Sequence, residues 1–332
     1  MRHVSRIGRL RTLAGGLGFG AALAAAPGVA SADPSTGAFS WLDELVSGLS
    51  VPAQTTSALD YQVSIFGIDL LPTADNTATA NSEIGSVAIA IGNGANADAN
   101  GGFFNFSLAD GDGASSVANS GAFGSFDVAV AEGTNTSAGA GLAGNFDAAF
   151  ASGTGSDAGT GVDGNFDVAF AGAGGTASTG LAGNFDAAFA SGTGSHAGAG
   201  LNSDLDIASA VGTDSNAAAG VGGSLIAASA DGANSSATAG FGFFDNATAV
   251  GIGSSATVSG TLDFALVNGA NSLAQAVAGI FDSATVFGDG SSALAGGDLT
   301  APASFDLAAV FGDMLNAIAT GENFLVDILP SL

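Results

Sequence analysis

The residues with the clearest chemical potential are aspartates that recur at a nearly regular interval. Successive members lie 18 to 24 residues apart, except for one gap of 39 residues in which Ile226 takes the expected position. The members are Asp127, Asp147, Asp167, Asp186, Asp206, Asp245, Asp263, Asp282 and Asp306. Carboxylate oxygens are the ligands that Ca²⁺ prefers. The spacing therefore makes these nine residues candidate metal ligands, as a row of Ca²⁺ sites.

The alternative is a structural role, in which each Asp accepts a backbone N–H near a turn and adds to the soluble surface. In a stack of strands about 4.8 Å apart, neighbouring carboxylates would repel by ~0.9 kcal/mol in water. The recurring sequence supplies one Asp per repeat, whereas Ca²⁺ takes six to eight oxygen ligands. The sequence favours the structural role and predicts no cofactor other than Ca²⁺.

Other catalytic residue types are scarce. The chain has no Cys, its last cationic residue is Arg11, and His196 is the one His beyond the first few residues. Nucleophilic triads and zinc sites therefore lack their residues, and a polysaccharide lyase lacks the Lys or Arg that would take a proton. With 30 acidic residues and a formal net charge of −26, the chain cannot neutralise a phosphate backbone. We predict a non-enzymatic protein that does not bind nucleic acid.

A repeat organises the chain. The stretch "GLAGNFDAAFASGTGS" occurs without a mismatch at Gly141 to Ser156 and again at Gly180 to Ser195. Anchoring the pattern on Gly153 and Gly192 extends it to twelve units, with Ala four positions before the anchor in eleven of them. Seven positions before the anchor a large apolar residue recurs: Phe104, Phe126, Phe146, Phe166, Phe185, Leu205, Leu225, Phe244, Leu262, Phe281 and Phe305. A period of about 20 residues is typical of stacked units that share one core.

The unit alternates with period two, as a β-strand does. In "NFDAAFA", Phe146 and Phe150 fall on one face, whereas Asp147, Ala149 and Ala151 fall on the other. Gly-rich turns follow, and several Gly per unit disfavour helix at ~1 kcal/mol each. The sequence predicts an all-β fold, a β-solenoid (β-roll or β-helix) of about 12 coils with two short strands each. We expect the Phe and Leu column to be buried, at ~1.5 to 3 kcal/mol per side chain.

The chain divides into four segments. Residues 1–32 are predicted to be a signal peptide, 33–83 an N-terminal cap with a short helix over Ser40 to Leu49, 84–303 the solenoid repeats, and 304–332 the last repeat and a C-terminal cap. The motifs "FGIDLLP" and "FLVDILP" flank the array and are expected to form related end caps, with a shared docking motif as the alternative.

The first segment also predicts where the protein goes. A basic start is followed by an apolar run from Leu13 to Ala26 and by Ala30-Ser31-Ala32, a small-x-small cleavage site. Cleavage after Ala32 would leave a chain with no Lys, no Arg and no membrane span. We predict a protein that is secreted or retained in the cell envelope.

Two resemblances add to this interpretation. "GSVAIAIGNGANADANG", from Gly85 to Gly101, resembles the head repeats of trimeric autotransporter adhesins, which implies a β-roll used for adhesion, although the later units here are longer. Over the whole chain, the "ASADP" junction followed by Gly and Ala rich repeats is similar to uncharacterised secreted repeat proteins of mycobacteria. These resemble the Gly-rich PGRS class, without its Pro-Glu leading domain or "GGAGG" runs. That resemblance implies an envelope or secreted location and no known reaction.

Two functions follow as predictions. The first is a non-enzymatic secreted or cell-surface structural or adhesive repeat protein, whose partner is either a second copy or an envelope or host surface. The alternative is an exported β-roll module that binds Ca²⁺ or is stabilised by it.

Overall fold

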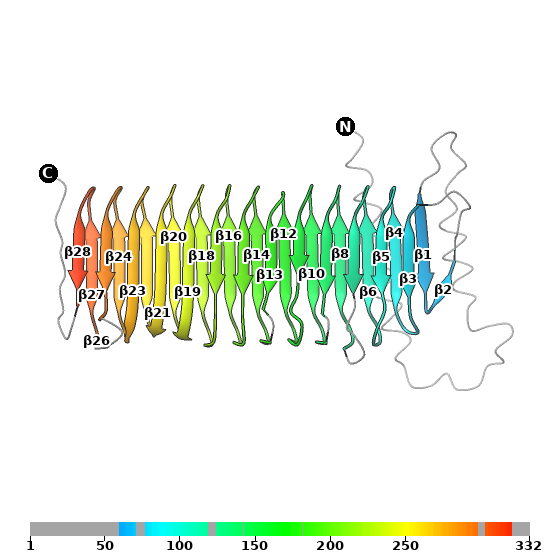
Figure 1. The fold of residues 1–332 in the computed structure, drawn as a ribbon, viewed down its shortest axis with the longest axis horizontal. Helices are drawn as coiled ribbons and strands as arrows, with labels where there is room; N and C mark the ends of the chain where they lie inside the picture. The colour runs from blue at the N-terminus through cyan, green and yellow to red at the C-terminus, as the bar shows by residue number, and fades with distance from the viewer. Residues whose placement is uncertain are drawn as a thin grey trace, which may run out of the picture. The chain divides into compact units, whose positions relative to one another are not determined.

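The repeats form a β-solenoid built from two parallel sheets (Figure 1). The computed structural model describes residues 60–70, 77–118, 124–141, 143–180, 182–297 and 303–320. These residues are all-β and contain no helix, hence none that could cross a membrane. The predicted fold class and the two strands per coil are confirmed.

The first sheet holds the strand that precedes each anchor Gly. In spatial order it contains β2 (Ile68–Asp69), β1 (Tyr61–Ile65), β4 (Val87–Ile91), β6 (Phe106–Asp110), β8 (Val128–Glu132), β10 (Ala148–Ser152), β12 (Val168–Gly172), β14 (Ala187–Ser191), β16 (Ile207–Val211), β18 (Ala227–Asp231), β20 (Asn246–Val250), β22 (Phe264–Asn268), β24 (Ser283–Phe287) and β27 (Leu307–Phe311).

The second sheet holds the strand that follows each anchor. It contains β3 (Thr79–Ser82), β5 (Asn96–Ala99), β7 (Ser115–Ala118), β9 (Ser137–Ala140), β11 (Asp157–Gly159), β13 (Thr176–Thr179), β15 (His196–Ala199), β17 (Asn216–Ala219), β19 (Ser236–Phe243), β21 (Ser255–Thr261), β23 (Leu273–Ile280), β25 (Ser292–Ala295) and β28 (Asn316–Ala319), with β26 (Ala303–Ser304) beside β23.

Strands stack in the register that the repeat predicts. Ala149 of β10 pairs with Ala129 of β8 on one side and with Ala169 of β12 on the other. The strands from β4 to β27 follow one another in parallel and make about 11 turns of about 20 residues, close to the predicted 12 coils. Equivalent residues of successive coils therefore form continuous columns along the solenoid.

The interior of each coil is narrow and lined mainly by alanine. In one coil Ala149 and Ala151 of β10 and Ala158 of β11 are all buried. Towards the C-terminal end Val258, Val267, Val286 and Val310 are buried alongside the alanines. The core is thus a set of Ala columns from two closely spaced sheets.

The prediction that the Phe and Leu column is buried is wrong. Phe146 is 48% exposed and Phe185 is 55% exposed. The sequence correctly assigned Asp147, Ala149 and Ala151 to one face of the strand and the aromatic residues to the other. In the structure the first face points inwards and the aromatic face points outwards. An interior filled by Ala methyl groups has no space for a phenyl ring.

Glycine is required at the anchors because successive turns approach closely. Gly133 has a φ of 125°, and a Cβ added there would collide with the carbonyl oxygen of Gly153, the next anchor. Side chains larger than hydrogen would push the coils apart at this edge.

One end of the first sheet is covered by a hairpin. Strand β1 pairs antiparallel with β4, and β2 pairs antiparallel with β1. The described part of the "FGIDLLP" motif, Phe66 to Leu70, lies in this hairpin, which agrees with its predicted place at the end of the array. The predicted signal peptide, the helix at Ser40 to Leu49 and the "FLVDILP" motif lie outside the described residues.

The narrow core gives a first prediction. Ala169→Leu adds three carbons inside the solenoid, and we expect it to lower the free energy of unfolding by ~1–3 kcal/mol or more. Phe104→Ser removes an exposed ring that stacks on one ring, Phe126, so it should cost less, about the 0.5–1.5 kcal/mol of a stacked aromatic pair. Urea unfolding followed by circular dichroism measures both. A larger loss for Phe104→Ser would contradict the inward-facing Ala columns.

Candidate functional site

The nine predicted aspartates form one column inside the solenoid, which we call the aspartate column. Each member precedes a strand of the first sheet, and each is at most 1% exposed. The prediction that they add to the soluble surface is therefore wrong. The nearly constant sequence interval correctly predicted that they form a column. Equal spacing in a stack with matched strand register places equivalent residues above one another.

One carboxylate oxygen of every column member except Asp306, the last of the row, accepts a backbone N–H from the next coil. The Asp147 N–H donates to Oδ1 of Asp127 at 3.2 Å, and the Asp167 N–H donates to Oδ1 of Asp147 at 3.0 Å. The pattern continues to the Ile226 N–H, which donates to Oδ1 of Asp206 at 2.9 Å. It resumes at Asp263 and reaches Asp306. The structural role predicted for these residues, to accept a backbone N–H near a corner, is what the hydrogen bonds show.

The second carboxylate oxygen lies against the glycines of the corner. Oδ2 of Asp147, Asp167 and Asp186 is buried and has no hydrogen-bond partner. A Cβ at Gly144, Gly164 or Gly183 would collide with the Oδ2 of the Asp three residues later. The backbone thus closes over Oδ2, and a negative charge on that atom is removed from water.

Burial raises the pKa values of these carboxyl groups. Desolvation is the largest cause at every shifted member, and it is opposed by the hydrogen bond from the next coil. The pKa rises to about 8 at Asp147, about 7 at Asp186 and Asp263, and about 6 at Asp167 and Asp245. Charge on neighbouring column members raises the pKa of Asp147 and Asp186 further. Several members therefore hold a proton near neutral pH.

Asn105 shows how a neutral group fits this column. It occupies the same position one coil before Asp127, and its Oδ1 accepts the Asp127 N–H at 3.1 Å. Its Nδ2 donates to the carbonyl oxygens of Asn100 and Gly101 in its own corner. An amide is the uncharged counterpart of a protonated carboxyl, with a donor in place of Oδ2. The position is therefore suited to a donor that turns towards the corner backbone.

Metal ligation has a limited basis in the part of the chain that the structure describes. Those residues include no group of three or more His, Cys, Asp and Glu side chains placed to hold one ion. Any cation at the column would depend on single carboxylates together with backbone carbonyls. His196, the one His of the repeats, is an exposed residue at the start of β15.

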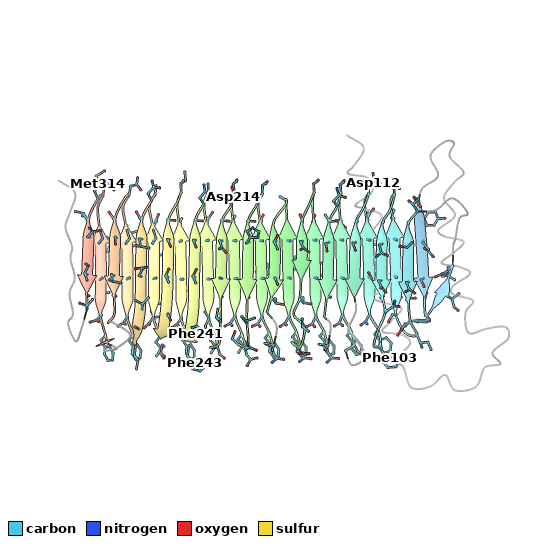
Figure 2. The ribbon with its side chains drawn as sticks, in the orientation of Figure 1. Phe103, Asp112, Asp214, Phe241, Phe243 and Met314 are labelled. Carbon is cyan, nitrogen blue, oxygen red and sulfur yellow. The ribbon has the colours of Figure 1, made fainter. Side chains whose placement is uncertain are left out.

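The outward-facing column next to the aspartates forms a second candidate site, the corner ladder. It runs along the edge at which Figure 2 labels Phe103, Phe241 and Phe243, opposite the edge with Asp112 and Asp214. Its members are Phe104, Phe126, Phe146, Phe166, Phe185, Leu205, Leu225, Phe244, Leu262, Phe281 and Phe305. Ten of the eleven are exposed by 42% to 65%, and Leu262 is intermediate. A continuous apolar strip thus lies on one edge of the solenoid.

Every member of the corner ladder has a left-handed backbone conformation. Their φ values lie between 61° at Phe244 and 70° at Phe126. This region costs a residue with a Cβ about 1–2 kcal/mol, and Gly, Asn or Asp are the usual occupants. Large apolar side chains at eleven such positions are unusual, and backbone strain of this kind concentrates at functional sites.

The phenyl rings of the ladder stack on one another. Centroids of Phe126 and Phe146 are 4.8 Å apart with an interplanar angle of 2°, and Phe166 and Phe185 are 4.9 Å apart and parallel. Stacking covers both faces of each inner ring and leaves its edge exposed. Since sugars and cations bind aromatic faces, the ladder offers apolar ring edges rather than sites for those ligands.

A row of amides borders the ladder. Asn145 Nδ2 donates to Oδ1 of Asn165 at 3.0 Å, and Asn165 Nδ2 donates to Oδ1 of Asn184 at 2.9 Å. The row ends where Asn184 donates to the exposed Asp204 at 2.8 Å. These side chains hydrogen-bond to one another along the border of the strip.

Sequence reasoning missed the exposure of the ladder, although a signal was present. Ala149 and Ala151 lie two residues apart on the face opposite to Phe146, and equivalent Ala pairs recur through most of the array. The face whose residue type varies least between repeats is the buried face, because tightly packed neighbours limit the volume of its side chains. A second aromatic row, Phe150, Phe170 and Phe189, also faces outwards from the first sheet, and Phe170 and Phe189 are 41% and 40% exposed.

Comparison of the chain with protein-family models, curated proteins and solved structures finds no match in any of the three.

The aspartate column predicts the pH dependence of stability. An unfolded Asp has a pKa near 3.9, whereas five column members have folded values of about 6 to 8. Between about pH 4 and 8 the folded state binds more protons than the unfolded state, so stability falls as pH rises. We expect the melting temperature to be highest near pH 4, to fall up to about pH 8 and then to level off.

Substitutions within the column provide the control. Asp147→Asn, Asp167→Asn and Asp186→Asn together keep the Oδ1 acceptors, so they should reduce this pH dependence without unfolding the protein, and Asp245 and Asp263 should account for what remains. Asp167→Ala leaves the Asp186 N–H without its buried acceptor and should cost ~1–3 kcal/mol more than Asp167→Asn. A melting temperature that rises between pH 4 and 8 in calorimetry would contradict the buried, protonated column.

Proposed function

We propose that this protein is a non-enzymatic structural or adhesive rod that is exported to the cell surface or its surroundings, and that the corner ladder is its contact surface. The observation that carries the proposal is the row of half-exposed Phe and Leu side chains at strained positions. Gly or Asn would adopt the same left-handed backbone conformation at a lower conformational free energy. Stacking within the chain covers the faces of the rings, and we attribute their exposed edges to contacts outside the chain.

The size of the strip supports the same role. An aromatic side chain has a surface of about 200 Å², so half-exposed members along the ladder present about 1,000 Å². Apolar patches larger than a few hundred Å² usually mark interaction surfaces. The uniform short corners also favour a contact surface over a cleft for a small substrate.

Export is supported by the sequence of residues 1–32 and by the charge of the remainder. After Ala32 the chain carries 30 acidic residues and no Lys or Arg. A chain of this charge stays soluble outside the cell and is repelled by anionic lipid headgroups. Retention at a surface would therefore depend on apolar contacts.

Localisation in the producing cells tests the proposal. We expect the wild-type protein in the envelope fraction, and the variant with Phe146→Asn, Phe166→Asn and Phe185→Asn mainly in the culture fluid. Asn suits the left-handed backbone, so the variant should fold. The matched control, with Phe150→Thr, Phe170→Thr and Phe189→Thr, should stay in the envelope fraction. Cytoplasmic wild-type protein, or equal retention of the ladder variant, would refute the proposal.

The second candidate is a Ca²⁺-binding or Ca²⁺-stabilised module, and the unpaired Oδ2 atoms of Asp147, Asp167 and Asp186 favour it. We rank it lower, because each coil contributes one carboxyl group and because Asn105 occupies the column as a neutral residue. Protonation neutralises the buried carboxyl without any further ligand.

Thermal unfolding in matched salts separates these candidates. We expect NaCl at the ionic strength of millimolar CaCl₂ to raise the melting temperature nearly as much as CaCl₂ itself, since both screen the acidic surface. An ion bound only by the folded state would add a further shift by mass action. A Ca²⁺-specific shift that disappears with Asp147→Asn, Asp167→Asn and Asp186→Asn would establish the second candidate.

A further inference from the structure

We infer that the partner of the corner ladder is a second copy of the same chain, so that two solenoids associate along their apolar edges into a dimer. This inference rests on the proposed contact role of the ladder and names its partner. Three features of the described residues carry it: the area of the strip, its repeat distance and the distribution of charge around it.

The exposed area is sufficient for a stable homodimer. Stable complexes bury about 800 Å² on each partner, and the ladder alone exposes about 1,000 Å². Phe103, Phe241 and Phe243, exposed by 60%, 63% and 55%, lie on the same edge and extend the strip (Figure 2). Two such strips can therefore cover each other without contributions from either sheet face.

The repeat distance of the ladder is matched by a second ladder. Ring centroids follow one another at 4.8 Å to 5.1 Å from Phe104 to Phe185, and the rings expose their edges. A two-fold interface pairs the same surface from both copies, so the spacing is equal by construction. Ring edges of one copy can then lie against the ring edges of the other at equal spacing along this part of the strip.

Charge favours this edge over the opposite edge as the contact between two copies. Asp112, Asp214, Asp231, Asp289 and Asp313 are exposed on the opposite edge, at the anchor turns. A strand of five residues spans about 17 Å, so pairing through the ladders separates the two acidic edges by more than about 30 Å. That distance is several Debye lengths in physiological salt.

Few ionised groups stand at the ladder itself. In the described corners at residues 220–226, 240–245, 259–263 and 278–282, the acidic residues are Asp245, Asp263 and Asp282, and all three are buried in the aspartate column. Among the other described corners of this edge, Glu83, Asp163 and Asp204 are exposed. A basic partner would find little to bind here, whereas another copy meets little repulsion.

Sedimentation velocity of the exported full chain between 1 and 100 µM tests the inference. We expect a dimer whose dissociation constant rises at least tenfold with Phe146→Asn, Phe166→Asn and Phe185→Asn. The control with Phe150→Thr, Phe170→Thr and Phe189→Thr removes the same number of rings from the sheet face and should leave the constant within twofold. Added NaCl should tighten the dimer, because Asp163 and Asp204 repel their counterparts.

A second variant, Leu205→Asn with Leu225→Asn, keeps the test independent of one set of rings and should also weaken the dimer. Circular dichroism confirms that each variant is folded. A wild-type chain that is monomeric at 100 µM, including one that binds neutral phosphatidylcholine vesicles instead, would overturn the inference, as would ladder variants that dimerise like the wild type.

The outcome is separable from that of the proposed function. A monomeric chain whose envelope retention still depends on the ladder overturns self-association and leaves the contact role intact. A ladder-dependent dimer whose envelope retention is unchanged by the ladder variants supports self-association and refutes the surface role.

Discussion

The width of the coil interior is the constraint on which the other features depend. Two sheets connected by short corners leave space for Ala methyl groups, and Ala149, Ala151 and Ala158 fill one such layer. Aromatic rings must therefore lie outside, even though a buried ring would contribute more free energy than a methyl group. Stability comes from repetition, because each coil adds the same small core and the same ladders of hydrogen bonds.

The same constraint explains the corner at which the two candidate sites meet. The chain must turn within a few residues between Asn145 and the start of β10, and a left-handed residue at Phe146 achieves this. The turn points Phe146 outwards and Asp147 inwards, so that Oδ1 accepts the N–H of Asp167 in the next coil. One backbone conformation thus places an apolar side chain at the edge and a buried carboxyl group at the adjacent position. Successive coils repeat both features along the solenoid.

Much of this architecture was predictable from the sequence. The interval of the anchors predicted the coils, period-two alternation predicted the strands, and the regular positions of Asp147 and Asp167 predicted a column that accepts backbone N–H groups. Which face lies inside was not predicted, since alternation separates two faces without measuring the space between sheets. Phe was assigned to the core by its hydrophobicity, but volume decides in a narrow coil. The burial of the column was missed for the same reason.

Burial of the aspartates also shapes the surface above them. A row of ionised carboxylates beneath the corner ladder would place negative charge next to the apolar strip and oppose contact with any acidic partner, including another copy. Because burial raises the pKa of Asp186 and Asp263 to about 7, this charge is reduced near neutral pH and returns in more alkaline solution. Protonation of the buried carboxyl groups therefore limits repulsion within the column and also keeps the contact edge nearly neutral, although the chain as a whole is strongly acidic.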